Sequence, residues 1–243
     1  MREEARAAAE IAAAAGKLLL EIRARLRTGT PPDVVRAEGD LRAHELILSL
    51  LAERFPDDAV LSEEAPDERR RPGAPRTWIV DPLDGTREFG EEGRADWAVH
   101  VALLEGGALA AGAVALPALD AVYATEPPPR APTPVSRPPR IVVSRTRPAP
   151  EARMLAARLG GELVPMGSAG AKAMAVVTGD VDVYFHTGGQ HVWDSAAPVA
   201  VAAAAGLHTS RADGAPLVYE AGSTWLPDLL ICRPELAAVV LAV

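Results

Sequence analysis

Residues 78–89 read Trp-Ile-Val-Asp-Pro-Leu-Asp-Gly-Thr-Arg-Glu-Phe. Their apolar start predicts a buried strand, and Asp81 and Asp84 follow it on a turn that the proline between them stiffens. Carboxylates that converge in this way suit hard cations such as Mg²⁺, which keep open positions for water and phosphate. If Gly85 and Thr86 open a helix or tight turn, their backbone N–H groups can hold a phosphate oxygen. The stretch therefore indicates metal-assisted phosphate chemistry.

The same residues also allow a purely structural interpretation. Asp81 with its proline can start a turn, and Asp84 with its glycine can close it, so that neither acid takes part in chemistry. Because Asp-Gly turns are common, the stretch alone leaves both interpretations open.

The composition is that of a globular protein. The 243 residues suffice for one large domain or two small ones with a full core. A net charge of −8 argues against general affinity for nucleic acid or anionic membranes, so a phosphorylated substrate would depend on local positive charge, with bound metal as its obvious source. Cys232 is the only cysteine, which excludes an intramolecular disulfide. The acidic start is unlike a signal peptide and the longest apolar run, 196–207, is too short to cross a bilayer, so we expect a soluble, cytoplasmic protein.

The first half combines helical periodicity with strand alternation. Apolar residues at helical spacing predict two long helices, and alternation after the central motif predicts an antiparallel meander. Residues 28–39, which begin Thr-Gly-Thr-Pro-Pro, predict a mobile loop between the helices. We interpret His100 as a core histidine, because no second His or Cys lies at ligand spacing. The expected helices are 3–27 and 41–55, and the expected strands are 59–61, 97–104, 108–116 and 120–125.

The second half alternates strands and helices, which implies an α/β unit with a largely parallel or mixed sheet. The proline-rich segment 127–139 reads as an extended linker, so we divide the chain into an α+β half, 1–130, and an α/β half, 138–243. Pro198 is tolerable only in the first turn of the alanine-rich helix to which it belongs. The expected strands are 141–144, 163–166, 181–185 and 229–232, and the expected helices are 148–159, 169–178, 195–206 and 234–243.

Three further acids have an ordinary structural interpretation. Asp40 and Asp194 each precede a predicted helix, where Asp is a favoured N-cap residue. Glu63 stands beside Glu64, and adjacent glutamates usually belong to a solvated surface. The capping interpretation does not exclude a functional one, because a carboxylate at a helix start can still accept a hydrogen bond from a distant hydroxyl.

Three motifs nevertheless occur in a suggestive order. Ser62-Glu63-Glu64 precedes the central stretch, and residues 193–198, Trp-Asp-Ser-Ala-Ala-Pro, follow it. Together they resemble the inositol monophosphatase superfamily and, within it, the CysQ-type 3'(2'),5'-bisphosphate nucleotidases, where a basic residue and Glu-Phe follow Gly-Thr. The resemblance covers nearly the whole chain. It implies a layered αβαβα sugar-phosphatase-like fold, with an antiparallel N-terminal sheet, a mixed C-terminal α/β sheet and the active site where the halves meet.

The resemblance also implies a set of metal ligands. It assigns two or three Mg²⁺ ions to each site, and it makes Thr86, linked to Asp40, the group that orients the attacking water. Glu64 would lie beside the ligands, and lithium would inhibit the enzyme. One Mg²⁺ would take Glu63, Asp81 and the Leu83 carbonyl, and a second would take Asp81, Asp84 and Asp194.

The substrate implied by the resemblance is 3'-phosphoadenosine 5'-phosphate, and also its sulfated form, hydrolysed at the 3' position to AMP in sulfur assimilation. Residues 87–89 match the nucleotidases, and Thr187 stands where inositol phosphatases usually place a glutamate. Lys172 matches the nucleotidase lysine, a cation suited to the second phosphate. The substrate contacts implied in this way are Gly85, Thr86, Arg87, Ser144 and Lys172.

Two departures from the family pattern concern the same site. Arg147 replaces the histidine of the family's Ser-Arg-Ser-His segment, which bears on contacts to adenine. Residues 28–39 lack the family's lysine near the metals, so Arg36 replaces it or the role is absent. We also expect a homodimer, since the family often pairs and symmetric dimers are the commonest oligomers.

The sequence also bears on several alternative functions. Residues 167–172 suggest a P-loop, but the glycine spacing is wrong and Ala173 follows the lysine where Ser or Thr is required. A haloacid-dehalogenase-type phosphatase would need one residue between its two aspartates, whereas this chain has two. Within the superfamily, inositol 1-phosphate or fructose 1,6-bisphosphate is the alternative substrate. A non-catalytic phosphonucleotide sensor is the alternative from another functional class.

Overall fold

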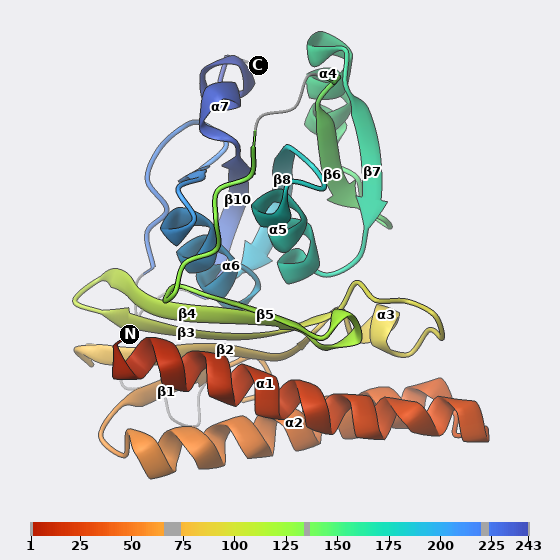
Figure 1. Ribbon diagram of the computed structural model, residues 1–243, viewed down its shortest axis with the longest axis vertical. Helices are drawn as coiled ribbons and strands as arrows, with labels where there is room; N and C mark the ends of the chain where they lie inside the picture. The colour runs from red at the N-terminus through yellow and green to blue at the C-terminus, as the bar shows by residue number, and fades with distance from the viewer. Residues whose placement is uncertain (1, 66–73, 134–136, 220–223, 243) are drawn as a thin grey trace.

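The computed structural model describes residues 2–65, 74–133, 137–219 and 224–242. Five layers succeed one another in Figure 1: two long helices, a first sheet, two central helices, a second sheet and two outer helices. Apolar clusters fill the spaces between the layers: one lies between the two long helices and the first sheet, one surrounds the two central helices between the sheets, and one lies on the outer face of the second sheet. The expected layered αβαβα fold is confirmed. No helix in the described ranges is long and apolar enough to cross a membrane.

The first sheet carries most of the predicted ligands. Its strands run in the order β1-β2-β3-β4-β5, with β1 and β2 parallel and every other pair antiparallel, which confirms the meander. The parallel pair is what matters for the site, because it brings the carboxyl ends of β1 and β2 to the same edge. The strands are β1 (Ala59–Ser62), β2 (Arg76–Asp84), β3 (Ala98–Glu105), β4 (Ala108–Leu116) and β5 (Ala121–Ala124).

Helices α1 (Glu3–Arg23) and α2 (Pro32–Arg54) cover the outer face of this sheet (Figure 1), and a 3₁₀ turn (Ala24–Thr28) follows α1. The predicted loop over 28–39 is wrong from Pro32 onward, because that proline begins α2. Proline suits the first helical position, where its fixed φ is already helical and its missing N–H would have no partner. Asp40 is therefore inside α2 and does not cap it.

The second sheet is mixed, as expected. Its order is β7-β6-β8-β10-β9, with β6 parallel to β7 and β8, and β10 antiparallel to β8 and β9. The short strand β9 was not predicted, because three residues carry too little pattern. The strands are β6 (Arg140–Ser144), β7 (Glu162–Met166), β8 (Val183–His191), β9 (His208–Ser210) and β10 (Trp225–Cys232).

Four helices pack on the second sheet. Helices α5 (Ala169–Thr178) and α6 (Val192–Ala204) lie between the two sheets, and α4 (Pro150–Leu159) and α7 (Pro234–Val240) lie on the outer side (Figure 1). The expectation for Pro198 is wrong, because it lies beyond the first turn of α6. The helix continues through it and forgoes the backbone bond that residue 198 would donate to the Asp194 carbonyl. In the segment 127–139 the described residues form no helix or strand, and its role as a domain boundary stays a prediction.

Candidate active site

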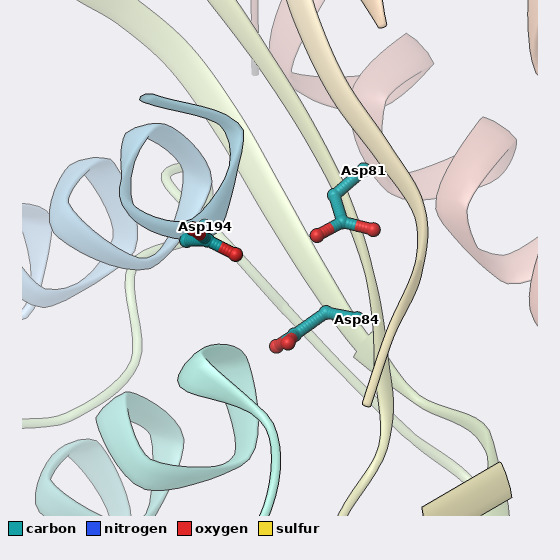
Figure 2. A group of neighbouring side chains, drawn as sticks. All are labelled: Asp81, Asp84 and Asp194. Carbon is teal, nitrogen blue, oxygen red and sulfur yellow. The ribbon is translucent and has the colours of Figure 1, made fainter. Parts of the chain in front are cut away.

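Three carboxylates meet where the first sheet faces α6. Asp81 and Asp84 come from the end of β2, and Asp194 comes from the first turn of α6. In Figure 2 the three side chains point toward a common space, and one oxygen of each lies within 4.8 Å of the others. The structure therefore brings together an acid pair and a third acid that are more than a hundred residues apart in the chain.

A bulge in β2 explains why both of its aspartates face this space. In a regular strand, residues three positions apart point to opposite faces. Here β2 advances from Asp81 to Asp84 while its partner β3 advances only from His100 to Ala98. The extra residue returns the second aspartate to the face of the first. The Leu83 N–H donates to Asp81 Oδ1 at 3.1 Å, which fixes the turn between them.

The crowding of acids raises the pKa of most members of the site. Burial, followed by the charges of Glu63, Asp84 and Asp194, holds the pKa of Asp81 well above its usual value. Burial and Asp84 likewise raise the pKa of Asp194. Like charges brought together in this way favour a bound cation, because the cation offsets both their repulsion and their lost hydration.

Asp84 is the exception, since protein donors already stabilise its charge. Its Oδ2 accepts hydrogen bonds from the Ser168 hydroxyl at 2.5 Å and from the Gly170 N–H at 2.7 Å. His100 Nε2 lies 3.2 Å from the same oxygen. Burial would raise the pKa of Asp84, but His100, Lys172 and Ser168 together hold it below the usual value. Within the described ranges no residue donates to Oδ1, so this oxygen remains available to a cation.

Glu63 approaches the three carboxylates from the end of β1. Its N–H donates to the Val80 carbonyl at 3.3 Å, so the parallel pairing of β1 with β2 extends as far as this residue. The residue as a whole is exposed, although its carboxylate faces Asp81, and it is not one of the compact group of three. Removal of its carboxylate from water, opposed by a hydrogen bond with Asp81, raises the pKa of Glu63 to about 7. Glu63 is thus beside the group, on its open side.

Thr86 and Asp40 form a second contact beside the acids. Gly85, with φ of +86°, makes the sharp turn from β2 into the short helix α3 (Thr86–Phe89). The Thr86 hydroxyl lies 3.4 Å from Asp40 Oδ1 and 3.1 Å from the Leu83 carbonyl. Burial and the charge of Glu64 raise the pKa of Asp40 to about 7, against the opposing effect of Thr86. The expected link between Asp40 and Thr86 is therefore present, although Asp40 does not cap a helix.

Residues 1–240 match the model of the inositol monophosphatase family. The chain belongs to this family.

Its relatives include nucleotidases. The chain is 49% identical to a 3'-phosphoadenosine 5'-phosphate phosphatase of Mycobacterium leprae, over 99% of this chain and 93% of the relative. It is 34% identical to the 3'(2'),5'-bisphosphate nucleotidase CysQ of Escherichia coli K12, over 77% of this chain and 80% of that protein. A solved structure of CysQ from Bacteroides thetaiotaomicron superposes with a TM-score of 0.76 at 27% identity, covering 94% of this chain and 96% of that one.

A cleft of about 380 Å³ opens beside the carboxylates of this family member. Asp84 and Asp194 line one part of it. Basic side chains line another part, and two of them already have carboxylate partners: Arg87 pairs with Glu91 at 3.3 Å, and Arg145 pairs with Glu88 at 2.5 Å. The cations that line the cleft are Arg87, Arg145, Arg147 and Lys172.

Lys172 and Arg147 differ in burial and in their hydrogen-bond partners. Lys172 is 5% exposed, and its ammonium donates to the carbonyls of Gly167 at 3.2 Å and Ser168 at 2.7 Å. Burial lowers the pKa of Lys172, against the opposing effect of Asp84 and Asp194. Arg147 is exposed and has no carboxylate partner within the described parts of the chain. Both are thus able to meet an anion in the cleft.

Of the other residues singled out in the sequence, some line the cleft and others bind protein groups outside it. Ser144 lines the cleft, but Arg36 turns its guanidinium toward Gly90 and lies 3.4 Å from the Arg87 carbonyl, a position set by α3. Thr187 donates to Glu151 at 2.9 Å. Glu88, from the central motif, is 5% exposed and forms its ion pair with Arg145 of the other half, so this motif residue ties the two halves together.

Ser168, Gly170 and His100 hold Asp84 in place, a role that was not predicted. The P-loop interpretation of residues 167–172, which fails on glycine spacing, also disagrees with the structure, because Ser168 and Gly170 donate to the Asp84 carboxylate. One local signal was available for Ser168: it precedes a predicted helix, and its hydroxyl does cap α5 by accepting from the Ala171 N–H at 3.0 Å. His100 is buried, as expected, but it also contacts the site.

Proposed function

We propose that this chain is a Mg²⁺-dependent phosphatase that removes the 3'-phosphate of 3'-phosphoadenosine 5'-phosphate to give AMP. The observation that carries the proposal is the similarity, over nearly the full length, to the 3'-phosphoadenosine 5'-phosphate phosphatase of Mycobacterium leprae. The same relationship supports the sulfated form of the nucleotide as a further substrate, and a place in sulfur assimilation.

The residues present fit a magnesium site. The ligand atoms are all oxygens, which Mg²⁺ prefers, and the raised pKa values of Asp81 and Asp194 mark a place where negative charge lacks compensation. We assign Glu63, Asp81 and the Leu83 carbonyl to one ion, and Asp81, Asp84 and Asp194 to another. When bound, Mg²⁺ supplies a water of lowered pKa and stabilises negative charge on the transferred phosphate and leaving oxygen.

The chain's own residues would then orient the reactants. Thr86, held by Asp40, positions the attacking water through its hydroxyl, and the N–H groups at the start of α3 face the phosphate from the Gly85 turn. Ser168 and Gly170 keep Asp84 ionised and fixed, so that it need not reorganise during the reaction.

The basic part of the cleft is suited to the second phosphate. Lys172 has three donors, and two are used by the Gly167 and Ser168 carbonyls, which leaves one for a substrate oxygen. Arg147 adds a guanidinium that no carboxylate within the described ranges neutralises, and Arg87 and Ser144 line the same cleft. A bisphosphate therefore fits this site better than a monophosphate does.

Steady-state kinetics test the proposal directly. We expect kcat/KM in Mg²⁺ to be higher for 3'-phosphoadenosine 5'-phosphate than for inositol 1-phosphate or fructose 1,6-bisphosphate. Arg147→Ala should reduce kcat/KM most for the nucleotide, and Arg153→Ala, an exposed arginine of α4 outside the cleft, is the matched control. A preference for inositol 1-phosphate would overturn the proposal, and binding without turnover in saturating Mg²⁺ would indicate a sensor. Lys172→Ala is less informative, because it also loosens the loop that holds Asp84.

Two further properties are proposed on the family relationship alone. Lithium should inhibit turnover, and the protein should form a homodimer. Light scattering at micromolar concentration tests the second proposal, and a particle of 25.4 kDa would contradict it.

A further inference from the structure

We infer that Trp225 is the stacking surface for the nucleobase of the substrate, and this inference rests on the proposed nucleotidase function. The chain has four tryptophans. Trp78 and Trp97 are fully buried and Trp193 is 5% exposed, whereas Trp225 is 51% exposed. Trp225 also lines the cleft that contains Asp84 and Asp194. An exposed indole inside a charged cleft calls for an explanation that the metal site does not provide.

The backbone around Trp225 is built to hold this ring. Gly189 has φ of +88°, and a Cβ added there would lie 1.7 Å from Trp225 Cζ2, so the six-membered part of the indole rests directly on the glycine backbone. Any other residue at 189 would have to displace the ring, and its backbone would be strained. Close approach of this kind fixes the indole before a ligand arrives, which lowers the entropic cost of stacking.

Neighbouring aromatic rings complete the support. Trp225 of β10 pairs in register with His191 of β8, and the two rings meet edge to face at 5.5 Å and 83°. The His191 ring in turn stacks on Trp193 at 4.5 Å and 6°. His191 is the N-cap of α6 and its N–H donates to Asp194 at 2.7 Å, so the aromatic group adjoins the carboxylates directly.

This arrangement points to a ligand that is anionic at one part and flat and aromatic at another. The carboxylates with their metal, together with Arg147 and Lys172, address phosphate groups. These charged groups do not bind a nucleobase. Trp225 can bind one, because stacking on an indole requires only a π-face. A purine nucleotide combines both features, whereas inositol and sugar phosphates lack the aromatic part. Trp225 therefore determines specificity in favour of nucleotides.

Binding of the product and of a base-free analogue tests this role. The probes are 5'-AMP and ribose 5-phosphate, titrated against the full chain in Mg²⁺. Stacking is expected to make Trp225→Ala lose about 5- to 150-fold in affinity for AMP, which corresponds to the roughly 1–3 kcal/mol measured per stacked base. Ribose 5-phosphate affinity should change by less than about twofold, and Trp225→Phe should retain an intermediate affinity for AMP because a ring remains. Met154→Ala, which removes a similarly exposed side chain of α4, is the control.

Fluorescence gives an independent readout. AMP should quench the indole emission of the wild type, and this quenching should disappear in Trp225→Phe. Equal losses for AMP and ribose 5-phosphate, or quenching that persists in Trp225→Phe, would overturn the inference. So would a change in oligomeric state on Trp225→Ala without loss of AMP affinity, because the ring would then serve a protein interface. If wild-type protein does not hydrolyse 3'-phosphoadenosine 5'-phosphate at all, the proposed function fails instead.

Discussion

The Thr86 hydroxyl lies 3.4 Å from the Asp40 carboxylate and 3.1 Å from the Leu83 carbonyl, so one hydroxyl joins α2 to the turn that carries the proposed metal ligands. A hydroxyl has one proton to donate and two lone pairs. If the proton goes to Asp40, the lone pairs of Thr86 are free to accept from water. If Asp40 is protonated, it can donate to Thr86, whose own proton can then turn to Leu83. The ionisation of Asp40 thus decides in which direction the Thr86 hydroxyl would orient the water of the proposed reaction.

Removal of this hydroxyl should slow the reaction. We expect Thr86→Ala to lower kcat by about 10²- to 10⁴-fold, the usual effect of losing positioned proton-transfer help, with a smaller effect on the Mg²⁺ concentration for half-maximal activity. Thr86→Ser keeps the hydroxyl and is the control. The double variant with Asp40→Asn should lose little more than Thr86→Ala alone, because the two groups act as a unit. Additive losses in kcat would argue against a shared role.

The two aspartates of the motif should respond to mutation in opposite directions. In EDTA, Asp84→Asn should lower the stability by about 1–3 kcal/mol, or roughly 2–10 °C in Tm, because Ser168, Gly170 and His100 all stabilise a negative charge there. Asp81→Asn should raise the Tm, because folding of the wild type must either bury a charge that the neighbouring acids repel or protonate this carboxylate, and the amide avoids both costs. Both variants should lose Mg²⁺-dependent turnover by more than about 10²-fold.

Scanning calorimetry with and without Mg²⁺ checks this contrast. The wild type should gain stability from the metal by mass action, and both variants should gain much less. If Asp81→Asn were as destabilising as Asp84→Asn in EDTA, the difference in their protein donors would not be the controlling factor. Near-normal activity of either variant would refute its assignment as a ligand.

The sequence predicted the parts of the site whose chemistry is local. One stretch contains the strand, the two aspartates, the glycine turn and the threonine. The apolar run predicts the strand, and the proline and glycine predict the turn that follows it. The helix α5 also has the predicted bounds, since its apolar periodicity is continuous. The fold class followed from the alternation of elements in the second half and the meander in the first.

Other features could not be predicted, because they depend on distant contacts or on ambiguous residues. Pro32 begins α2, but the sequence alone does not distinguish a proline that begins a helix from one that belongs to a loop. Ser168 meets Asp84 across 84 positions, and no local pattern encodes that contact. The exposed position of Trp225 depends on the pairing of β10 with β8, which only the folded sheet establishes.

Proton binding should compete with metal binding near neutral pH. In the metal-free protein, burial raises the pKa of both Asp40 and Glu63 to about 7. Between the unfolded pKa values near 4 and about pH 7, the folded state therefore holds more protons than the unfolded state, and the contribution of these groups to stability falls as pH rises through this window. Mg²⁺ requires ionised ligands, so its stabilising effect should grow as pH rises through 7.

Calorimetric titration of Mg²⁺ at pH 6 and pH 8 measures this competition. At pH 6 the binding enthalpy should vary with the ionisation enthalpy of the buffer, because protons are released, and at pH 8 the variation should be smaller. Glu63→Gln should reduce the release at pH 6. The absence of any buffer dependence at pH 6 would show that the carboxylates are already ionised.

The two ring nitrogens of His100 contact two different parts of the site. Nδ1 lies 3.0 Å from the Trp193 carbonyl, and Nε2 lies 3.2 Å from Asp84 Oδ2. The ring is fully buried, and a Cβ on Gly170 would lie 2.1 Å from Nε2, so the imidazole has no freedom to move away. It spans the space between β2 and the start of α6, next to Asp194.

Conservative substitutions separate the two contacts. The amide nitrogen of Gln can reach the position of Nε2, and that of Asn can reach the position of Nδ1. We expect His100→Gln to keep most of the Mg²⁺ affinity, because a donor still faces Asp84, whereas His100→Asn should weaken Mg²⁺ binding by about 10- to 100-fold, as is usual when the partner of a metal ligand is lost. His100→Leu should also lower the Tm, because it leaves the Trp193 carbonyl buried without a donor, at a cost of roughly 1–3 kcal/mol. Activity as a function of Mg²⁺ concentration, together with the Tm in EDTA, distinguishes these outcomes. Equal Mg²⁺ affinity in the Gln and Asn variants would mean that the contact between His100 and Asp84 does not position this ligand.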